Sequence, residues 1–230
     1  MNPQHIIRFL TELAAHNHKT WFDANRGWYQ EVKAEFSEFT EQLIQRVAAF
    51  DPRCQGLTVR DCTYRINRDI RFSTDKSPYK THMGAYVCPQ GKKSGMAGYY
   101  FHLQAPDVDY LNGNLLAVGA YNPSKEELQS MREEIFENAE GFKADLAQAA
   151  PFTLEGGLND KLKKNPQGFP ADFVDMELLK YKSYCLAFEL TDRQLAQEPL
   201  DAWVAGQFHR AYAFNERLNR AIQFAHEEML

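Results

Sequence analysis

The sequence predicts an α+β fold, in which N-terminal and C-terminal helices flank a mainly antiparallel sheet. Apolar residues recur at helical spacing through residues 1–50, alternate with period two in much of 55–122, and return to helical spacing in much of 123–230. Because helices and strands fall in separate runs, this order favours an α+β architecture over a doubly wound parallel sheet. The chain of 230 residues is long enough to bury a large core, and we expect the three parts to form a single domain.

The first part, residues 1–50, is expected to contain two helices. Pro3 suits the first turn of a helix, where its missing N–H group does no harm. The polar residues 16–19 interrupt the apolar pattern, and Thr20 is positioned to cap a second, longer helix. That helix should end before Pro52, because the residue that precedes a proline disfavours the helical conformation.

The second part, residues 55–122, is expected to supply most of the sheet. Residues 89–95 have the proline, glycine and serine composition of a turn, so the strands on either side of them should form a hairpin. The predicted strands alternate apolar and polar residues or are bounded by turn residues. They are 57–59 with 62–66, 83–88, 98–103 and 115–121.

The third part, residues 123–230, mixes helices with a strand. Ser124 with Glu127, and Thr191 with Gln194, have the spacing of a capping box, in which each side chain satisfies a backbone N–H group of the other residue. The first box should open a helix. The remaining expectations are a short helix at 142–149, an irregular stretch at 151–170, a short helix at 176–180, a strand at 184–190 and a final helix from about 199 onward.

Composition and charge argue against several classes of function. The net charge of −5 disfavours general binding of nucleic acids, which requires a basic surface. The four cysteines form no C-x-x-C pair, which argues against a structural zinc site. No apolar stretch approaches the ~20 residues of a membrane span. Since there is no secretory signal, we expect a reduced, cytoplasmic protein. From the cysteine spacing and the apolar stretches we expect no metal and no membrane partner. The sequence identifies no cofactor and no protein partner.

The densest polar segment, residues 65–82, is net positive in an acidic chain. Arginine binds carboxylate or phosphate through two parallel hydrogen bonds, and lysine adds positive charge. Ser77 and Pro78 should bend the chain and bring its cations together. We therefore expect a pocket for a small phosphate- or carboxylate-bearing ligand. Its candidate binding residues are Arg65, Arg68, Arg71, Lys76, Lys80 and His82, together with Arg26 from the N-terminal helices.

Two carboxylates lie within the same segment. If the pocket is an active site, Asp69 or Asp75 would act as a general base or a magnesium ligand, and the arginines would stabilise developing negative charge. His82 and His102 are a further candidate acid–base or ligand pair, and the alternative for His102 is a histidine hydrogen-bonded within the core.

The alternative interpretation gives the same charges a structural role. Asp69 and Asp75 would each pair with an arginine, and Arg26 would pair with a neighbouring acid, so that the charges form an ion-pair network. The protein would then be an interaction module, in which aromatic helices and the 151–170 segment dock a partner protein. The sequence alone leaves both interpretations open.

The sequence also resembles a family of uncharacterised proteins. Five stretches carry the resemblance, in order along nearly the whole chain: Trp21-Phe22-x-x-x-Arg26-x-x-Tyr29, Arg68-Asp69-x-Arg71-Phe72-Ser73-x-Asp75-Lys76-x-Pro78-Tyr79-Lys80, Gly98-Tyr99-Tyr100-x-His102-Leu103, Leu179-Lys180-Tyr181-Lys182-Ser183 and Phe214-Asn215-x-Arg217-Leu218-Asn219. Together they are similar to the domain of unknown function numbered 2461. This resemblance implies one full-length domain and no established activity.

Overall fold

The computed structural model describes the whole chain except residues 107, 109–110, 112, 155–159 and 229–230. Within the described residues, four strands pair in chain order to form one antiparallel sheet. They are β1 (His82–Val87), β2 (Gly98–Gln104), β3 (Leu115–Ala120) and β4 (Tyr184–Glu189). The predicted α+β fold with an antiparallel sheet is therefore confirmed, and so are the strands expected at 83–88, 98–103, 115–121 and 184–190, within one or two residues at each end.

The pairing register divides the side chains of the sheet between two faces. Gly84 pairs with His102, and Tyr86 pairs with Tyr100. Because side chains alternate across a strand, the even-numbered residues of β1 and β2 share one face, which we call the open face. The odd-numbered residues of β3 and β4 lie on this face too, since Tyr100 also pairs with Ala117.

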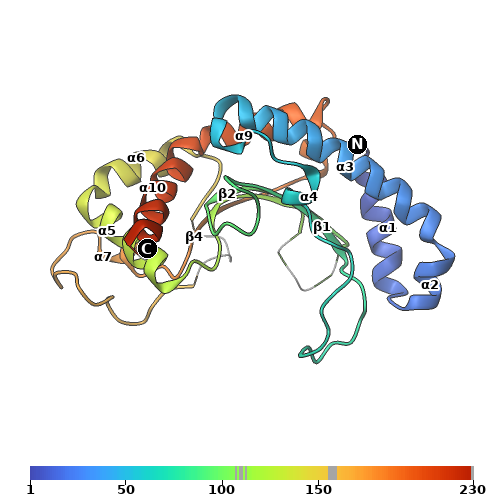
Figure 1. The fold of residues 1–230 in the computed structure, drawn as a ribbon, viewed down its shortest axis with the longest axis horizontal. Helices are drawn as coiled ribbons and strands as arrows, with labels where there is room; N and C mark the ends of the chain where they lie inside the picture. The colour runs from blue at the N-terminus through green and yellow to red at the C-terminus, as the bar shows by residue number, and fades with distance from the viewer. Residues whose placement is uncertain (107, 109–110, 112, 155–159, 229–230) are drawn as a thin grey trace.

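The opposite face, which we call the helix face, is covered by α3 (Arg26–Phe50) and α9 (Leu200–Arg210), which run across the sheet in Figure 1. Its residues form the main hydrophobic core, and the ring of Phe101 packs 4.6 Å from that of Phe39 on α3. In Figure 1 the described helices leave the lower, open face of the sheet uncovered.

Further helices stand beside the sheet (Figure 1). On the β1 side are α1 (Pro3–Ala15) and α2 (Lys19–Ala24), and on the β4 side are α5 (Lys125–Glu137), α6 (Ala139–Gln148) and α10 (Tyr212–Glu228). The short helices are η1 (Pro52–Cys54), α4 (Val59–Cys62), α7 (Met176–Leu179) and α8 (Asp192–Leu195). None of the described helices has both the length and the apolar character required to cross a membrane.

The prediction of a strand over 57–59 and 62–66 is wrong. Residues Val59–Cys62 form the single helical turn α4, which a capping box opens: the Asp61 carboxylate accepts a hydrogen bond from the backbone N–H of Thr58 at 2.9 Å. Of the residues after this turn, Thr63 forms an isolated bridge with Ala85 of β1. The segment with the alternating pattern therefore lies beside the sheet, and it forms an isolated bridge with β1 but no strand.

Two long predicted helices are each divided. The helix expected from Thr20 onward begins at Lys19 with His18 as its N-cap, so the prediction that Thr20 caps it is wrong. It is interrupted at Asn25, and α3 then continues to Phe50, so its predicted end before Pro52 is confirmed. The final helix is interrupted at Ala211, between α9 and α10. The Ser124 capping box is confirmed, since its hydroxyl accepts a hydrogen bond from the backbone N–H of Glu127 at 3.1 Å.

Candidate functional site

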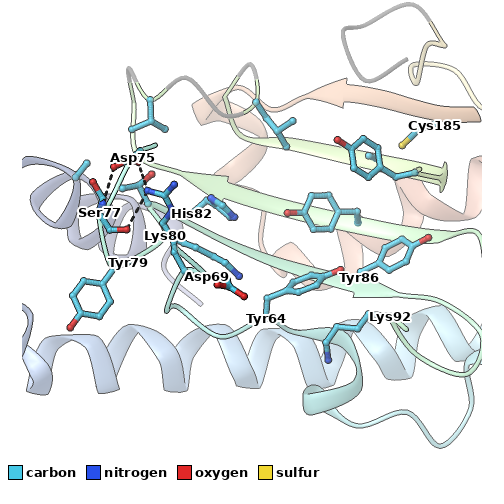
Figure 2. A pocket seen from close by; sticks show the side chains of 18 of the residues that line it. Tyr64, Asp69, Asp75, Ser77, Tyr79, Lys80, His82, Tyr86, Lys92 and Cys185 are labelled. Atoms are coloured by element: carbon cyan, nitrogen blue, oxygen red, sulfur yellow. Dashed lines mark hydrogen bonds and ion pairs between the residues drawn. The ribbon is translucent and has the colours of Figure 1, made fainter. Parts of the chain in front are cut away.

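The open face of the sheet forms the floor of a cavity of about 880 Å³ (Figure 2). All the strands contribute to this floor, with His82, Tyr86, Gly98, Tyr100, Ala117, Gly119 and Cys185. One wall comes from the segment before β1, which extends away from the sheet on the same side (Figure 1). Its lining residues are Tyr64, Arg68, Asp69, Asp75, Ser77, Tyr79 and Lys80. A cavity of this size accommodates a small organic molecule.

Two tyrosines on the floor form what we call the aromatic corner. Tyr86 and Tyr100 face each other across β1 and β2, with ring centroids 6.4 Å apart and ring planes at 68°. Each ring leans over a glycine of the neighbouring strand. A Cβ atom at Gly84 would lie 2.6 Å from Cε2 of Tyr100, and a Cβ atom at Gly98 would lie 2.9 Å from Cε2 of Tyr86. Glycine at both positions therefore lets the rings lie where they do.

Hydrogen bonds hold the aromatic corner in place. The Tyr86 hydroxyl lies 2.8 Å from the carbonyl oxygen of Met96 and 3.0 Å from that of Gly119, so it donates to backbone across the floor. Burial raises the pKa of Tyr86 well above its ordinary value. The Tyr100 hydroxyl lies 2.8 Å from Nδ1 of His102. These hydrogen bonds therefore fix the orientations of both phenol groups.

His102 is a buried, central member of a short hydrogen-bonded chain. Its Nε2 atom lies 3.0 Å from Oε1 of Gln104, whose amide nitrogen donates to the carbonyl oxygen of Leu111 at 2.8 Å. An amide oxygen only accepts, so Nε2 of His102 carries the proton and Nδ1 accepts from Tyr100. Burial lowers the pKa of His102 to about 4. The imidazole is therefore neutral at pH 7, and it fixes the Tyr100 ring.

His82 lies beside this chain, with its ring centroid 5.2 Å from that of His102. Burial is the main cause that lowers the pKa of His82 to about 3, and the nearby charges of Lys80 and Arg68 lower it further. His82 is therefore also neutral at pH 7. It joins the cationic wall of the cavity to the aromatic corner without adding a charge of its own.

Lys80 enters the cavity from a short ladder at the base of the segment before β1. The backbone N–H of Lys80 donates to the carbonyl oxygen of Ile66 at 2.8 Å, and Asn67 forms a bridge with Tyr79. Tyr79 is buried and its ring stacks on that of Phe22, 4.0 Å away. Because successive side chains of an extended segment point in opposite directions, the anchored Tyr79 directs Lys80 into the cavity.

The ammonium group of Lys80 lies 5.5 Å from the centroid of the Tyr64 ring, and that of Lys92 lies 5.8 Å from the same ring. Figure 2 shows both lysines next to Tyr64. Burial, and then the charge of Arg65, lowers the pKa of Lys80 below its ordinary value. Among the described residues, no carboxylate lies within ion-pair distance of the Lys80 ammonium group.

Arg68 is held by partners within its own segment. It pairs with Asp75, and it donates to the carbonyl oxygen of Ser77 at 3.2 Å and to the hydroxyl of Ser73 at 3.4 Å. Hydrogen bonds from Ser77, followed by the one from Arg68, lower the pKa of Asp75 to about 2. Asp75 is therefore ionised at neutral pH and closes the loop between residues 68 and 77.

Arg71 forms the second ion pair of the segment with Asp69, and the Arg71 side chain itself lies outside the cavity lining. Its Nε and Nη2 atoms donate to the two carboxylate oxygens of Asp69 at 2.9 and 2.6 Å. The Arg71 side chain is 76% exposed, and the neighbouring Phe72 is 96% exposed. These residues therefore form the outer tip of the segment, where solvent screens the pair.

The structure brings together some of the predicted site residues and not others. Arg68, Asp69, Asp75, Lys80 and His82 line the cavity, whereas the lining does not include Arg65, Arg71, Lys76 or Arg26. Lys76 donates to the carbonyl oxygen of Ile70 at 2.9 Å. Arg26 pairs with Asp23 at 2.5 Å on the N-terminal helices. The charges of the segment thus divide between the cavity wall and local ion pairs.

Sequence reasoning did not select Tyr64, Tyr86, Tyr100, Lys92 or Cys185, which also line the cavity. The available signal was the period of two, which puts Tyr86 on the same face of β1 as His82, and Tyr100 on the same face of β2 as His102. The Cys185 thiol is no nucleophile at neutral pH, because burial raises its pKa to about 12. In the part of the chain that the structure describes, no cluster of three or more His, Cys, Asp or Glu residues could hold a metal ion.

Comparison with known families places the chain in a class that is defined by sequence alone. A family model described as a conserved hypothetical protein matches residues 5–216. The chain therefore belongs to that family, DUF2461, as the resemblance of its motifs predicts. Neither the curated proteins nor the solved structures contain a match.

Proposed function

We propose that this protein binds a small molecule carrying a carboxylate or phosphate group in the cavity of the open face. The single observation that supports this most strongly is Lys80. Its ammonium group is partly buried in the cavity wall, and no carboxylate of the described residues lies within ion-pair distance. Removing a cation from water is unfavourable unless an opposite charge compensates it. An anionic ligand would supply that charge.

Two neighbouring groups suit the same ligand. Lys92 approaches the Tyr64 ring at a distance similar to that of Lys80, and its ammonium group also donates to the carbonyl oxygen of Arg60. Lys92 therefore adds positive charge to the same side of the cavity. Arg68 would add positive charge from the wall, although Asp75 already neutralises part of it. Lysine binds phosphate and carboxylate as a point charge, and the proposal therefore names their shared chemistry, an oxyanion.

The proposal is for binding and includes no reaction. Asp69 accepts hydrogen bonds from Arg71, and Asp75 accepts them from Ser77 and Arg68. These bonds lower the pKa of each carboxyl group. A carboxylate whose pKa is lowered is a weaker base than an ordinary one. We therefore assign both residues to shaping the segment before β1.

The experiment is a titration with inorganic phosphate and with acetate, at an ionic strength held constant with sodium chloride. We expect at least one of these anions to raise the melting temperature of the wild-type protein, and Lys80→Met to remove most of that rise. Lys76→Met is the matched control, because this lysine belongs to the same segment but lies outside the cavity lining. The proposal is wrong if neither anion stabilises the protein, or if Lys80→Met and Lys76→Met respond alike.

A further inference from the structure

We propose that the anionic group of the ligand is attached to a planar aromatic ring, and that this ring binds against the aromatic corner formed by Tyr86 and Tyr100. The inference rests on the proposed function, since it adds a second part to the same ligand. It names a substrate class: aromatic carboxylates or aromatic phosphate esters of one or two rings, as opposed to aliphatic acids, sugar phosphates or free anions.

The geometry of the aromatic corner suits an aromatic ring. The two tyrosine rings are 6.4 Å apart and their planes meet at 68°. Aromatic rings prefer offset stacking and edge-to-face contact, because the face of a ring is negative and its edge positive. A planar ring in this corner can stack on one tyrosine and meet the edge of the other. A saturated ring fills the same space without either contact.

The floor around the aromatic corner is lined by small and apolar residues. Gly98, Ala117 and Gly119 follow one another across β2 and β3 on the open face, and Gly98 pairs with Gly119. Glycine and alanine have small side chains or none, so they leave space beside the tyrosines and carry no polar side-chain group there. Leu115, Ala117 and Cys185 form a small apolar cluster there, with Tyr100 packed against it. An apolar ring fits this floor better than a hydroxylated sugar does.

The cations of the cavity lie on one side of the aromatic corner. Tyr64 lies next to Tyr86 in Figure 2, close enough to affect the pKa of Tyr86, and the Lys80 and Lys92 ammonium groups approach the Tyr64 ring. The positive charge therefore lies at one edge of the aromatic corner, at the side of Tyr64. A ligand that satisfies both features has an anionic group attached directly, or by a short link, to its ring.

The experiment compares ligands that differ only in the ring. Phenyl phosphate, cyclohexyl phosphate and inorganic phosphate are titrated by calorimetry, with benzoate, cyclohexanecarboxylate and acetate as the second series. In the series whose anion binds, we expect the aromatic member to bind about threefold to tenfold more tightly than the cyclohexyl member. The two series distinguish a phosphate from a carboxylate as the anionic group, and the ring comparison is read in whichever series binds.

Variants of Tyr100 test whether the corner causes this preference. Tyr100→Leu keeps apolar volume but removes the ring, so the aromatic and cyclohexyl ligands should bind equally. Tyr100→Phe, the matched control, keeps the ring and loses the hydroxyl bonded to His102, so the preference should remain. Gly84→Ala provides a second route, because its new methyl group would displace the Tyr100 ring and should reduce the preference.

The outcomes separate the two proposals. Equal binding of aromatic and cyclohexyl ligands to the wild-type protein, together with a Lys80-dependent response to the free anion, would overturn the ring and leave the anion site standing. A preference for the aromatic ligand that survives Tyr100→Leu and Gly84→Ala would move the ring away from this corner and overturn the inference. If no anion in either series binds, both proposals are wrong.

Discussion

The two faces of the sheet use the same strands for different purposes. On the helix face of β2, Tyr99, Phe101 and Leu103 are fully buried, and they pack into the core beneath the long helices. On the open face of the same strand, Tyr100 and His102 alternate with them and line or support a cavity. One strand of seven residues therefore contributes both to the core and to the candidate site.

The comparison shows how a cavity is kept open on a sheet. The helix face is filled by large side chains that meet helices, whereas the open face combines tyrosines with glycines on neighbouring strands. Gly119 has a positive φ of 130°, and a Cβ atom there would collide with the backbone of Tyr184. Glycine weakens a strand. At these positions the loss of strand stability accompanies the space that the cavity and the tyrosine rings require. Small side chains on the open face thus leave room for the cavity, whereas large side chains on the helix face fill the space beneath the helices.

The largest expected effect comes from emptying the helix face. Phe101→Ala should lower the free energy of unfolding by about 3–5 kcal/mol, because it removes a fully buried ring and leaves a void between β2 and α3. Urea denaturation measures this change. The partner experiment is Tyr100→Leu on the open face, which should cost clearly less. Equal losses for the two variants would show that the open face is as tightly packed as the core, and the distinction between the faces would disappear.

Much of the fold could be predicted because hydrophobic period and turn residues act locally. The hairpin of β1 and β2 follows from two apolar stretches around a turn at 89–95, and the end of α3 follows from Pro52. The segment 57–66 misled because α4 is a single turn, too short to show a helical period. Its Thr58–Asp61 capping box was visible in the sequence but competed with a pattern of alternation.

The candidate site could be predicted only in part, because it depends on register and on contacts over long distances in sequence. The cluster at 65–82 is visible as a density of charge. Which of its cations enters the cavity depends on the Asn67–Tyr79 bridge and on the stacking of Tyr79 against Phe22 of α2. The aromatic corner depends on the pairing of Tyr86 with Tyr100. A sequence pattern gives the face of each strand but not the partner across it.

A second, smaller effect should come from His102, a buried histidine of the open face. Burial lowers the pKa of His102 to about 4, whereas a histidine in the unfolded chain titrates near 6.5. Between these values the unfolded state binds more protons than the folded state, so stability is complete above about pH 6.5 and falls as the pH decreases toward 4. The loss from this group is about 1.4 kcal/mol per pH unit, or about 3 kcal/mol over the window.

The measurement is the free energy of unfolding of wild type and His102→Asn between pH 7.5 and 4.5. Asparagine does not titrate in this range, so the variant should show the shallower pH dependence of the two. His82 contributes to the remaining slope, since burial lowers its pKa to about 3. The lowered pKa of Asp75, about 2, acts only below the ordinary carboxyl value and therefore outside this window. Parallel curves for the two proteins would show that His102 has the same pKa in the folded and unfolded states, and therefore that it does not belong to a dry part of the open face.

The smallest change in melting temperature should come from a variant of Arg71, which lies outside the cavity lining. Arg71 and Asp69 pair at the exposed tip of the segment before β1, and the Arg71 side chain is outside the cavity lining. Solvent screens such a pair, so Arg71→Ala should melt close to the wild-type temperature and keep its response to phosphate or acetate. Lys80→Met, by contrast, should also melt near that temperature but lose the response. If Arg71→Ala instead abolished anion binding, the cationic wall would extend to the tip of the segment, and the cavity would have to close around Arg71 when it binds its ligand.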